Sequence, residues 1–353
     1  MLKGYMSTLL GDKIFRLTLS TTFLCNLKCS HCNIWKIYKD NPSLLKKELN
    51  PKEIEKIVET TKPLYIGVTG GEPLIKPGIP DSLESILEIG KDPHLISVNS
   101  NGYATVLIVS TAEKLADIAD RIGKEVAFSI SIDGPPDLHN KIRGVSDSYQ
   151  RAVKTIKALK EISDTYKGFH VFVEYTVMEE NLGSFPQTVK SLESNTGLRF
   201  KSDEFVINVV QASRYYNTES RHVDYTKFLQ EIRLIRKFLS DKKIFDKSLS
   251  KHAFIQRAFL SKLELWLSDG YRHKCFAAEK SAFIDPFGDV YPCLPRYGVN
   301  KLGNVRDYDY DVTKILRSAI AKIFREKIRP KCNCWTPCES YTTLALRPYM
   351  LIH

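Results

Sequence analysis

The stretch CNLKCSHC, residues 25–32, carries three cysteines in the spacing C-x3-C-x2-C. A structural zinc site needs four ligands, and a ferredoxin-type run supplies a fourth cysteine close by. His31 directly precedes Cys32, so one ion could bind both side chains only under strain. Three thiolates without a nearby fourth therefore indicate a [4Fe–4S] cluster in which one iron is left open for a small ligand.

The composition is that of a folded protein, with 43% hydrophobic and 26% charged residues among 353. This length suits one large α/β unit with a smaller appendage, or two domains. We find no run of about 18 apolar residues that would span a membrane, and the first residues do not resemble a signal peptide. We therefore expect a cytoplasmic protein, in which clustered cysteines are metal ligands or catalytic groups and not disulfides.

The net charge is +11, with an isoelectric point near 9.1. Such a balance favours an anionic partner, which could be nucleic acid, phosphate, a carboxylate or a lipid headgroup. The basic residues are spread along the chain. A lysine-rich surface without a specific partner is therefore an equally good explanation.

Strand-like and helix-like segments alternate through the first 215 residues. The strand-like runs are 16–21, 64–70, 95–100, 126–133, 170–177 and 204–210. The helix-like segments between them are 51–61, 82–91, 111–123, 149–163 and 185–194. This alternation predicts parallel βαβ units, and the nearly continuous apolar character of the strands predicts cover on both faces of the sheet. We expect an α/β fold built as an open, partial (β/α)6 TIM-like barrel.

The rest of the chain changes character twice. Residues 222–269 show apolar residues at helical spacing and predict two helices. From Tyr271 onward, cysteine, glycine and proline become frequent. We expect three parts, namely a barrel core at 1–215, a helical connector at 216–270 and a small C-terminal iron–sulfur module at 271–353.

A second motif, GGEP, follows the second predicted strand as Gly70, Gly71, Glu72 and Pro73. Functional groups of β/α barrels lie on the loops after the strands, which places this motif beside the cysteine loop. The glycines let a ligand approach the backbone closely, and the carboxylate of Glu72 can accept hydrogen bonds from an ammonium group. Alone, the motif would equally fit an ordinary Gly-Pro turn, but one βα unit after the cysteine loop it is a strong signal.

Together, the three-cysteine loop and GGEP resemble the radical SAM enzymes, as does FSISIDGPPDLHNKIRG at 128–144, which is similar to the branch that modifies peptides and tetrapyrroles. The resemblance implies that Cys25, Cys29 and Cys32 ligate a [4Fe–4S] cluster. Its open iron would bind the amino and carboxylate groups of S-adenosylmethionine (SAM). Reductive cleavage of SAM would then yield methionine and a 5′-deoxyadenosyl radical, which abstracts hydrogen from the substrate.

The resemblance also implies residues that bind SAM at the strand ends. They are His31, Gly70, Gly71, Glu72, Asn99, Ser129, Ser131, Asp133, Arg143 and Met178, with Asn101 and Val177 nearby. Ser129, Ser131 and Asp133 alternate and are expected on one face of the strand. Ser131 or Asp133 would reach the ribose or the methionyl moiety, and Arg143 would pair with the methionyl carboxylate. Asp133-Gly134 is also a turn signal, and Arg143 could equally be a surface cation.

The remaining five cysteines lie near the C-terminus, at Cys275, Cys293, Cys332, Cys334 and Cys338. The turn sequence DPFGDV at 285–290 predicts a β-hairpin before Cys293. Five cysteines in a small module indicate one auxiliary [4Fe–4S] cluster with four cysteine ligands, and a zinc site is the alternative. Of the five, Cys275 and Cys293 are the stronger ligand candidates. One of the last three is expected to be spare, unless only three ligate and one iron is open to substrate.

This C-terminal region resembles the SPASM module or its shortened form, twitch. The full module carries more cysteines and a second cluster, and here C-x-C replaces the usual C-x2-C. The resemblance therefore implies a single auxiliary cluster.

Several functions are compatible with these motifs. We favour a radical SAM enzyme that acts on an anionic tetrapyrrole, lipid, peptide or small metabolite and receives electrons from a reductant such as ferredoxin or flavodoxin. An RNA-modifying member is an alternative, but nucleic acid is not the expected partner because no basic run with interleaved aromatics occurs. A non-catalytic electron carrier is a second alternative. The GGEP motif counts against it, because an electron carrier needs no pocket for SAM. No catalytic residue is assigned; Glu174, Tyr175 and Tyr215 could act as substrate-side acid, base or radical relay, but core positions suit them better.

Overall fold

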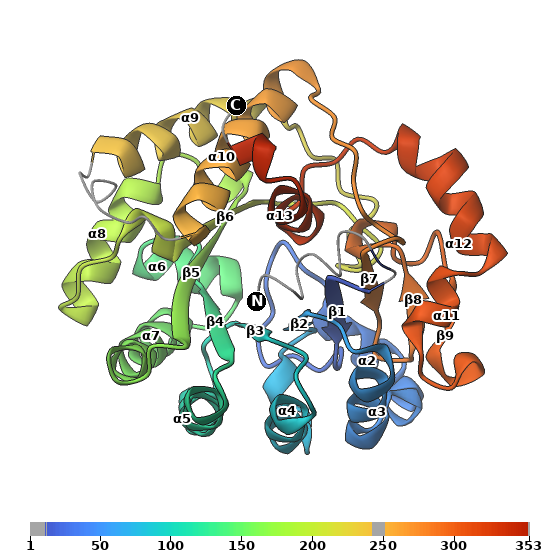
Figure 1. Ribbon diagram of the computed structural model, residues 1–353. Helices are drawn as coiled ribbons and strands as arrows, with labels where there is room; N and C mark the ends of the chain where they lie inside the picture. The colour runs from blue at the N-terminus through green and yellow to red at the C-terminus, as the bar shows by residue number, and fades with distance from the viewer. Residues whose placement is uncertain (1–10, 12, 242–250, 352–353) are drawn as a thin grey trace.

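The computed structural model describes residues 11, 13–241 and 251–351 (Figure 1). Within these residues a curved nine-stranded sheet has the order β6-β5-β4-β3-β2-β1-β7-β8-β9. Its first six strands are β1 (Arg16–Ser20), β2 (Tyr65–Thr69), β3 (Leu95–Ser100), β4 (Glu125–Ser131), β5 (Phe169–Val177) and β6 (Phe205–Val209). All neighbours among these six pair in parallel. The predicted partial β/α barrel is therefore confirmed. The first ten residues, for which the sequence predicts no signal peptide, lie outside the described part.

Helices cover the convex side of this sheet (Figure 1). They are α3 (Pro51–Thr61), α4 (Ile79–Glu88), α5 (Thr105–Ile122), α7 (Ser148–Thr165) and α8 (Phe185–Thr196). The start of α3 is set by a capping box, in which the Asn50 side chain accepts from the backbone N–H of Glu53 and the Glu53 side chain accepts in return. α4 begins three residues earlier than predicted, with a proline in its first turn. A short helix, α6 (Pro136–Arg143), was not predicted.

The two faces of the barrel sheet differ, contrary to the expectation of apolar strands covered on both sides. In β5 the burial alternates strictly along the strand. On the convex face, apolar side chains such as Leu17 and Ile66 are fully buried against the helices. On the concave face, polar residues line up by register, with Asn99 beside Ser129. The concave face of the barrel strands therefore carries polar side chains, among which a ligand would find hydrogen-bond partners.

The C-terminal part joins the same sheet. The predicted helices correspond to α9 (Thr226–Asp241) and α10 (Lys251–Asp269). The hairpin then forms from β7 (Ser281–Ile284) and β8 (Asp289–Tyr291), and β9 (Gly303–Asn304) pairs with β8. β7 also pairs in parallel with β1, with Arg16 opposite Ser281. The division of the chain into three parts stays a prediction. The pairing of β1 with β7 joins the predicted barrel core to the predicted C-terminal module in one sheet.

The remaining helices complete the structure. They are α2 (Ile37–Asp40), α11 (Val312–Leu316), α12 (Ala319–Ile323) and α13 (Pro337–Leu346). α13 lies on the concave side of the sheet, with α10 on one side of it and β7 on the other (Figure 1). Among the described residues, no helix is long and apolar enough to cross a membrane.

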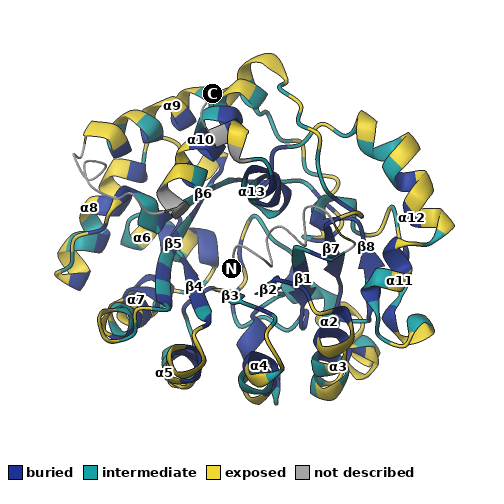
Figure 2. Cartoon of the chain, viewed as in Figure 1, coloured by how far each residue is buried: buried dark blue, intermediate teal, exposed yellow. Residues whose placement is uncertain are grey.

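Two buried clusters hold these layers together. The larger one fills the space between the convex face and its helices and extends to α10, α13 and the hairpin. Buried residues concentrate on the strands and on the inward sides of the helices (Figure 2). The smaller one includes Phe23, Tyr215 and Phe283. The Tyr215 ring centroid lies 5.9 Å from that of Phe23 and 5.1 Å from that of Phe283. The smaller cluster thus joins the chain just before the cysteine loop to the C-terminal hairpin.

Candidate functional site: two groups of cysteines

The cysteine loop and the GGEP motif form one unit at the ends of β1 and β2. The backbone N–H of Gly71 donates to the Thr22 carbonyl at 2.8 Å, and that of Glu72 donates to the Leu24 carbonyl at 2.7 Å. A Cβ on residue 71 would lie 2.1 Å from the Leu24 carbonyl oxygen. Glycine is therefore required at position 71, because the two loops pass too close for any side chain.

Glu72 is fully buried and anchored to the end of β3. Its Oε1 accepts from the Ser100 hydroxyl at 2.8 Å, and its Oε2 accepts from the backbone N–H of Asn101 at 2.8 Å. Burial raises the pKa of Glu72 to about 7. The Asn101 side-chain nitrogen lies 4.0 Å from Cys25 Sγ. The predicted residues Glu72, Asn101 and Cys25 are thus neighbours, although each Glu72 oxygen already accepts one hydrogen bond from the protein.

Arg143 links the cysteine loop to the end of β4. Its guanidinium forms an ion pair with Asp133, and its Nη1 lies 3.9 Å from Cys29 Sγ. The backbone carbonyl of Arg143 also accepts from the N–H of Lys28 at 3.1 Å. Burial opposes ionisation of Asp133, but Arg143 holds the pKa of this carboxyl below its usual value. Arg143 is therefore an interior cation and not a surface one.

Asp133 lies beyond the last residue of β4, so the strand alternation that groups it with Ser129 and Ser131 ends before it. Its Oδ1 accepts from the backbone N–H of Thr176 at 3.0 Å. In this structure the carboxylate is bound to protein groups, whereas the resemblance placed it near the ribose or methionyl group of SAM.

Two residues that support Asp133 were missed in the sequence. His139 Nδ1 accepts from the backbone N–H of Asp133 at 3.1 Å, and Asn181 Nδ2 donates to the Asp133 carbonyl at 2.9 Å. Both are fully buried, and burial lowers the pKa of His139 to about 3. The 128–144 motif contained His139, but nothing in the sequence connected Asn181 to it.

Of the three N-terminal thiols, Cys29 is buried and Cys25 and Cys32 are partly buried. Burial raises the pKa of Cys25 and Cys32 to about 12 and also raises that of Cys29. The Nδ1 atom of His31, in the same loop, is buried without a hydrogen-bond partner. Such thiols stay protonated until a metal displaces the proton.

This donor set of three thiols suits an iron–sulfur cluster. Within the described residues, no three metal-binding side chains converge as they would around one ion. A cluster takes one thiolate per iron, so its ligands need not point at a common centre.

The other predicted SAM-binding residues lie further along the concave face or in the core. Asn99 Nδ2 donates to Glu174 Oε2 at 3.3 Å, and Ser131 pairs in register with Glu174. Met178, which the resemblance associates with the adenine, is fully buried in the main core. Gly70 adopts a φ of 155° and lies against Thr22. The structure therefore gathers the cysteines, Glu72 and Arg143 more closely than it gathers Asn99 and Met178.

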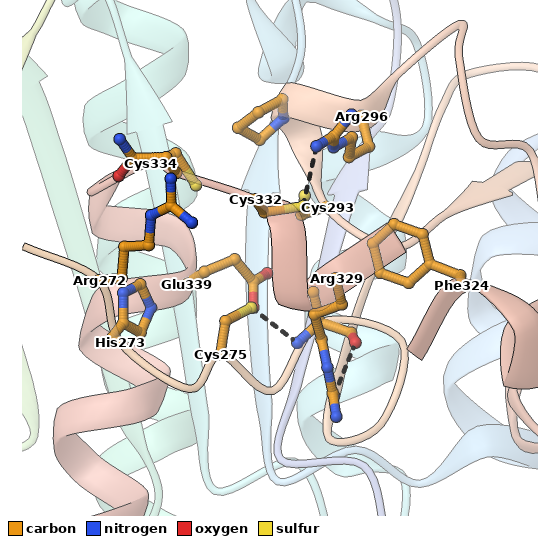
Figure 3. A pocket seen from close by; sticks show the side chains of 13 residues that line it. Arg272, His273, Cys275, Cys293, Arg296, Phe324, Arg329, Cys332, Cys334 and Glu339 are labelled. Carbon is orange, nitrogen blue, oxygen red and sulfur yellow. Dashed lines mark hydrogen bonds between the residues drawn. The ribbon is translucent and has the colours of Figure 1, made fainter. Parts of the chain in front are cut away.

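Four of the five C-terminal cysteines line one cavity of about 210 Å³ (Figure 3). They are Cys275, Cys293, Cys332 and Cys334. Arg296 Nη2 donates to Cys332 Sγ at 2.8 Å, and Glu339 extends from α13 into the same space. Cys338 does not line this cavity. Sequence reasoning missed Glu339, which follows Cys338 directly.

Comparison with known protein families gives two matches. The model of the radical SAM superfamily matches residues 19–192. The model of the SPASM iron–sulfur cluster-binding domain matches residues 275–339. The first match contains the N-terminal cysteine loop and GGEP, and the second contains all five C-terminal cysteines.

Several curated relatives align over much of the chain. The pre-heme d1 synthase of Dinoroseobacter shibae is 26% identical over 205 residues, which cover 58% of this chain and 45% of the relative. The protein AlbA of Bacillus subtilis, named for biosynthesis of the antilisterial bacteriocin subtilosin, is 23% identical over 341 residues, which cover 91% of this chain and 66% of the relative. The chain therefore spans less than half the length of the first of these relatives.

Solved structures share the fold. SuiB of Streptococcus suis bound to its precursor peptide SuiA has a TM-score of 0.60 at 17% identity, covering 92% of this chain and 70% of SuiB. The protein anSMEcpe with bound AdoMet and a peptide also has a TM-score of 0.60, at 15% identity, covering 96% of this chain and 98% of that protein.

Proposed function

Because this chain belongs to the radical SAM superfamily and carries a SPASM iron–sulfur domain, we propose that it is an enzyme that starts radical chemistry on an anionic substrate. Its cofactors are a [4Fe–4S] cluster, SAM and further iron–sulfur chemistry in the C-terminal domain. When bound, the reduced cluster and SAM supply a 5′-deoxyadenosyl radical that abstracts a hydrogen atom.

One observation carries this proposal, namely that separate motifs meet at the cysteine loop. The loop receives backbone hydrogen bonds from Gly71 and Glu72, which follow β2. It also contacts Asn101, which follows β3, and Arg143, which ends α6. A carrier of electrons would need the thiols but not this surrounding set of polar groups.

Each group has a distinct role in this proposal. Cys25, Cys29 and Cys32 ligate the cluster. Glu72 and the backbone around Gly71 receive the amino group of SAM, for which a carboxylate oxygen retains unused lone pairs. Arg143 and Asp133 hold the loop in place, and Cys29 beside them is buried.

The anionic character of the substrate is supported by Arg16 as well as by the net charge of +11. Arg16 lies on the concave face, where its Nη1 donates to the Cys338 carbonyl at 2.8 Å. Its Nε has no hydrogen-bond partner, and within the described part of the chain it forms no ion pair. The carboxylates of Glu339 and Glu174 act on Arg16 only from beyond ion-pair distance, so a carboxylate or phosphate of the substrate is a fitting direct partner for it.

Two further proposals concern the surroundings of the enzyme. Cluster thiols persist in a reducing compartment, and we therefore place the protein in the cytoplasm. The electrons would come from a small carrier such as ferredoxin or flavodoxin. Among substrates, we include tetrapyrroles, lipids, peptides and small metabolites, because the relatives and neighbours named above include a pre-heme d1 synthase and peptide complexes.

The decisive experiment needs no knowledge of the substrate. The protein is purified without oxygen, reconstituted with iron and sulfide, reduced and mixed with SAM, and 5′-deoxyadenosine is measured. We expect the nucleoside from the natural chain and none from Cys29→Ala. Arg151→Ala, on the exposed side of α7, serves as the matched control and should keep the activity. A reducible cluster that binds no SAM would contradict the proposal and favour an electron carrier.

A further inference from the structure

The cavity of the SPASM domain contains a carboxylate among its thiols. Glu339 is 4% exposed, and its Oε2 accepts from the Ser281 hydroxyl of β7 at 2.6 Å. The side chain extends from the first turn of α13 into the space between the cysteines (Figure 3). A buried carboxylate with one hydrogen bond retains an oxygen for another partner.

Glu339 and Cys338 are adjacent on a helix and therefore face different directions, about 100° apart. Glu339 faces the cavity, whereas Cys338 is absent from its lining. Besides Glu339, the groups whose charges act on Cys338 are Arg16 and Glu174 of the barrel. The helix thus presents the carboxylate, and not the neighbouring thiol, to the cavity.

Three thiols share the surroundings of Glu339. Cys275, Cys293 and Cys334 line the same cavity as the Glu339 carboxylate. These four groups come from the segment before β7, the hairpin, the loop before α13 and α13 itself, so they surround the cavity.

Cys332 is bound differently. Its Sγ accepts from Arg296 Nη2 at 2.8 Å and donates to the Ile328 carbonyl at 3.6 Å. Both hydrogen-bonding capacities of this thiol are therefore used by the protein.

We propose that the auxiliary [4Fe–4S] cluster is ligated by Cys275, Cys293, Cys334 and the carboxylate of Glu339, with Cys332 and Cys338 outside the ligand set. Each iron then has one protein ligand, and one iron has an oxygen donor. Coordination requires the carboxylate form, and metal binding releases the protons of the ligands. Arg272, Arg296 and Arg329 line the cavity and compensate the negative charge of such a site.

This inference rests on the auxiliary cluster of the proposed function, so the test is separated from SAM cleavage. Cys25→Ala, Cys29→Ala and Cys32→Ala are combined in the full chain, which leaves only the C-terminal site to bind iron. Iron and sulfide are measured per chain after anaerobic reconstitution, together with electron paramagnetic resonance and Mössbauer spectra. This triple variant, which is the parent of the variants described next, should hold about four irons per chain.

In that background, Glu339→Gln should lose about one iron and show a three-iron spectrum, because an amide is a poor ligand for iron. Ser281→Ala removes the hydrogen bond of Glu339 but keeps its carboxylate, and should hold about four irons. Cys332→Ala and Cys338→Ala should also hold about four irons per chain. Glu339→Cys should also keep about four irons, with a changed Mössbauer signal for one of them.

Three outcomes would overturn the inference. Glu339→Gln could keep the full iron content and an unchanged spectrum. Cys332→Ala or Cys338→Ala could lose the cluster, which would establish an all-thiolate site. The parent could bind no iron at all, which would remove the auxiliary cluster from the proposed function too, while the measurement of 5′-deoxyadenosine on the natural chain would still decide the N-terminal chemistry.

Discussion

Arg143 pairs with Asp133 in the protein interior while its guanidinium lies 3.9 Å from Cys29 Sγ. The two partners lie at opposite ends of one segment, since Asp133 follows β4 and Arg143 ends α6. One ion pair therefore closes this segment and also places a positive charge beside a cluster ligand. The consequences concern both stability and iron binding.

Replacing Arg143 should destabilise the fold strongly. In Arg143→Ala, Asp133 would be a buried carboxylate without its counter-ion, and we expect a loss of about 3–5 kcal/mol in the free energy of unfolding. Denaturant unfolding under anaerobic conditions measures this loss. Arg151→Ala is the control, because Arg151 and Asp147 form an exposed pair worth about 0.5 kcal/mol or less. Equal effects of the two substitutions would contradict the role given to the buried pair.

Gly71→Ala should disrupt the N-terminal cluster. The added Cβ would lie 2.1 Å from the Leu24 carbonyl oxygen, so the cysteine loop would have to move. We expect loss of iron from this site and loss of SAM cleavage, both measured after reconstitution. Gly123→Ala is the matched control, because nothing lies within 4 Å of its Cβ position. Its positive φ should cost about 1 kcal/mol in stability without affecting iron. Full iron content in Gly71→Ala would refute this account.

Asp285 should make stability depend on pH. Burial raises the pKa of this carboxyl to about 7, although its Oδ1 accepts from the backbone N–H groups of Phe287 and Asp289. The unfolded chain ionises near pH 4, so between about pH 4 and 7 the folded state binds more protons than the unfolded one. Stability should therefore fall as the pH rises through this window, by on the order of 4 kcal/mol.

The substitution Asp285→Asn isolates this effect, because the amide oxygen keeps the two hydrogen bonds without a titrating group. Unfolding curves at several pH values give the free energy of unfolding of each protein. The value for the natural chain minus that for the variant should fall between about pH 4 and 7. Asp309→Asn, in an exposed turn, serves as the control. A difference that stays constant across the window would count against the raised pKa.

Phe283→Ala should weaken the junction between the cysteine loop and the hairpin. The ring is 1% exposed and packs edge-on against Tyr215. We expect a loss of about 3–5 kcal/mol from the cavity and the lost burial, measured by denaturant unfolding. Phe254→Ala is the comparison, because that ring is 43% exposed and should contribute less than about 1 kcal/mol. If both changes cost the same, the second aromatic cluster does not have the proposed role.

The sequence predicted the barrel well because its strands and helices carry local signals. The strand-like run at 95–100 is found unchanged as β3, and the helix at 51–61 is bounded by a capping box that can be read from Asn50 and Glu53. The short helix α6 escaped prediction because its eight residues begin at the second of two adjacent prolines and carry no long apolar period. The polar concave face was also missed, because it becomes evident only when the alternating residues of neighbouring strands are aligned by register.

The sequence by itself determined the family and its cofactors, since the spacing of Cys25, Cys29 and Cys32 and the GGEP motif are local patterns with a physical meaning. Only the tertiary structure decided which groups share a site. It paired Arg143 with Asp133, brought Asn181 under Asp133, and faced Glu339 into the SPASM cavity in place of Cys338. Asn181 is distant from Asp133 in the chain, the Arg143–Asp133 pair depends on how the segment between them folds back, and the exposure of Glu339 to the cavity depends on the rotation of α13. No local sequence pattern encodes these three arrangements.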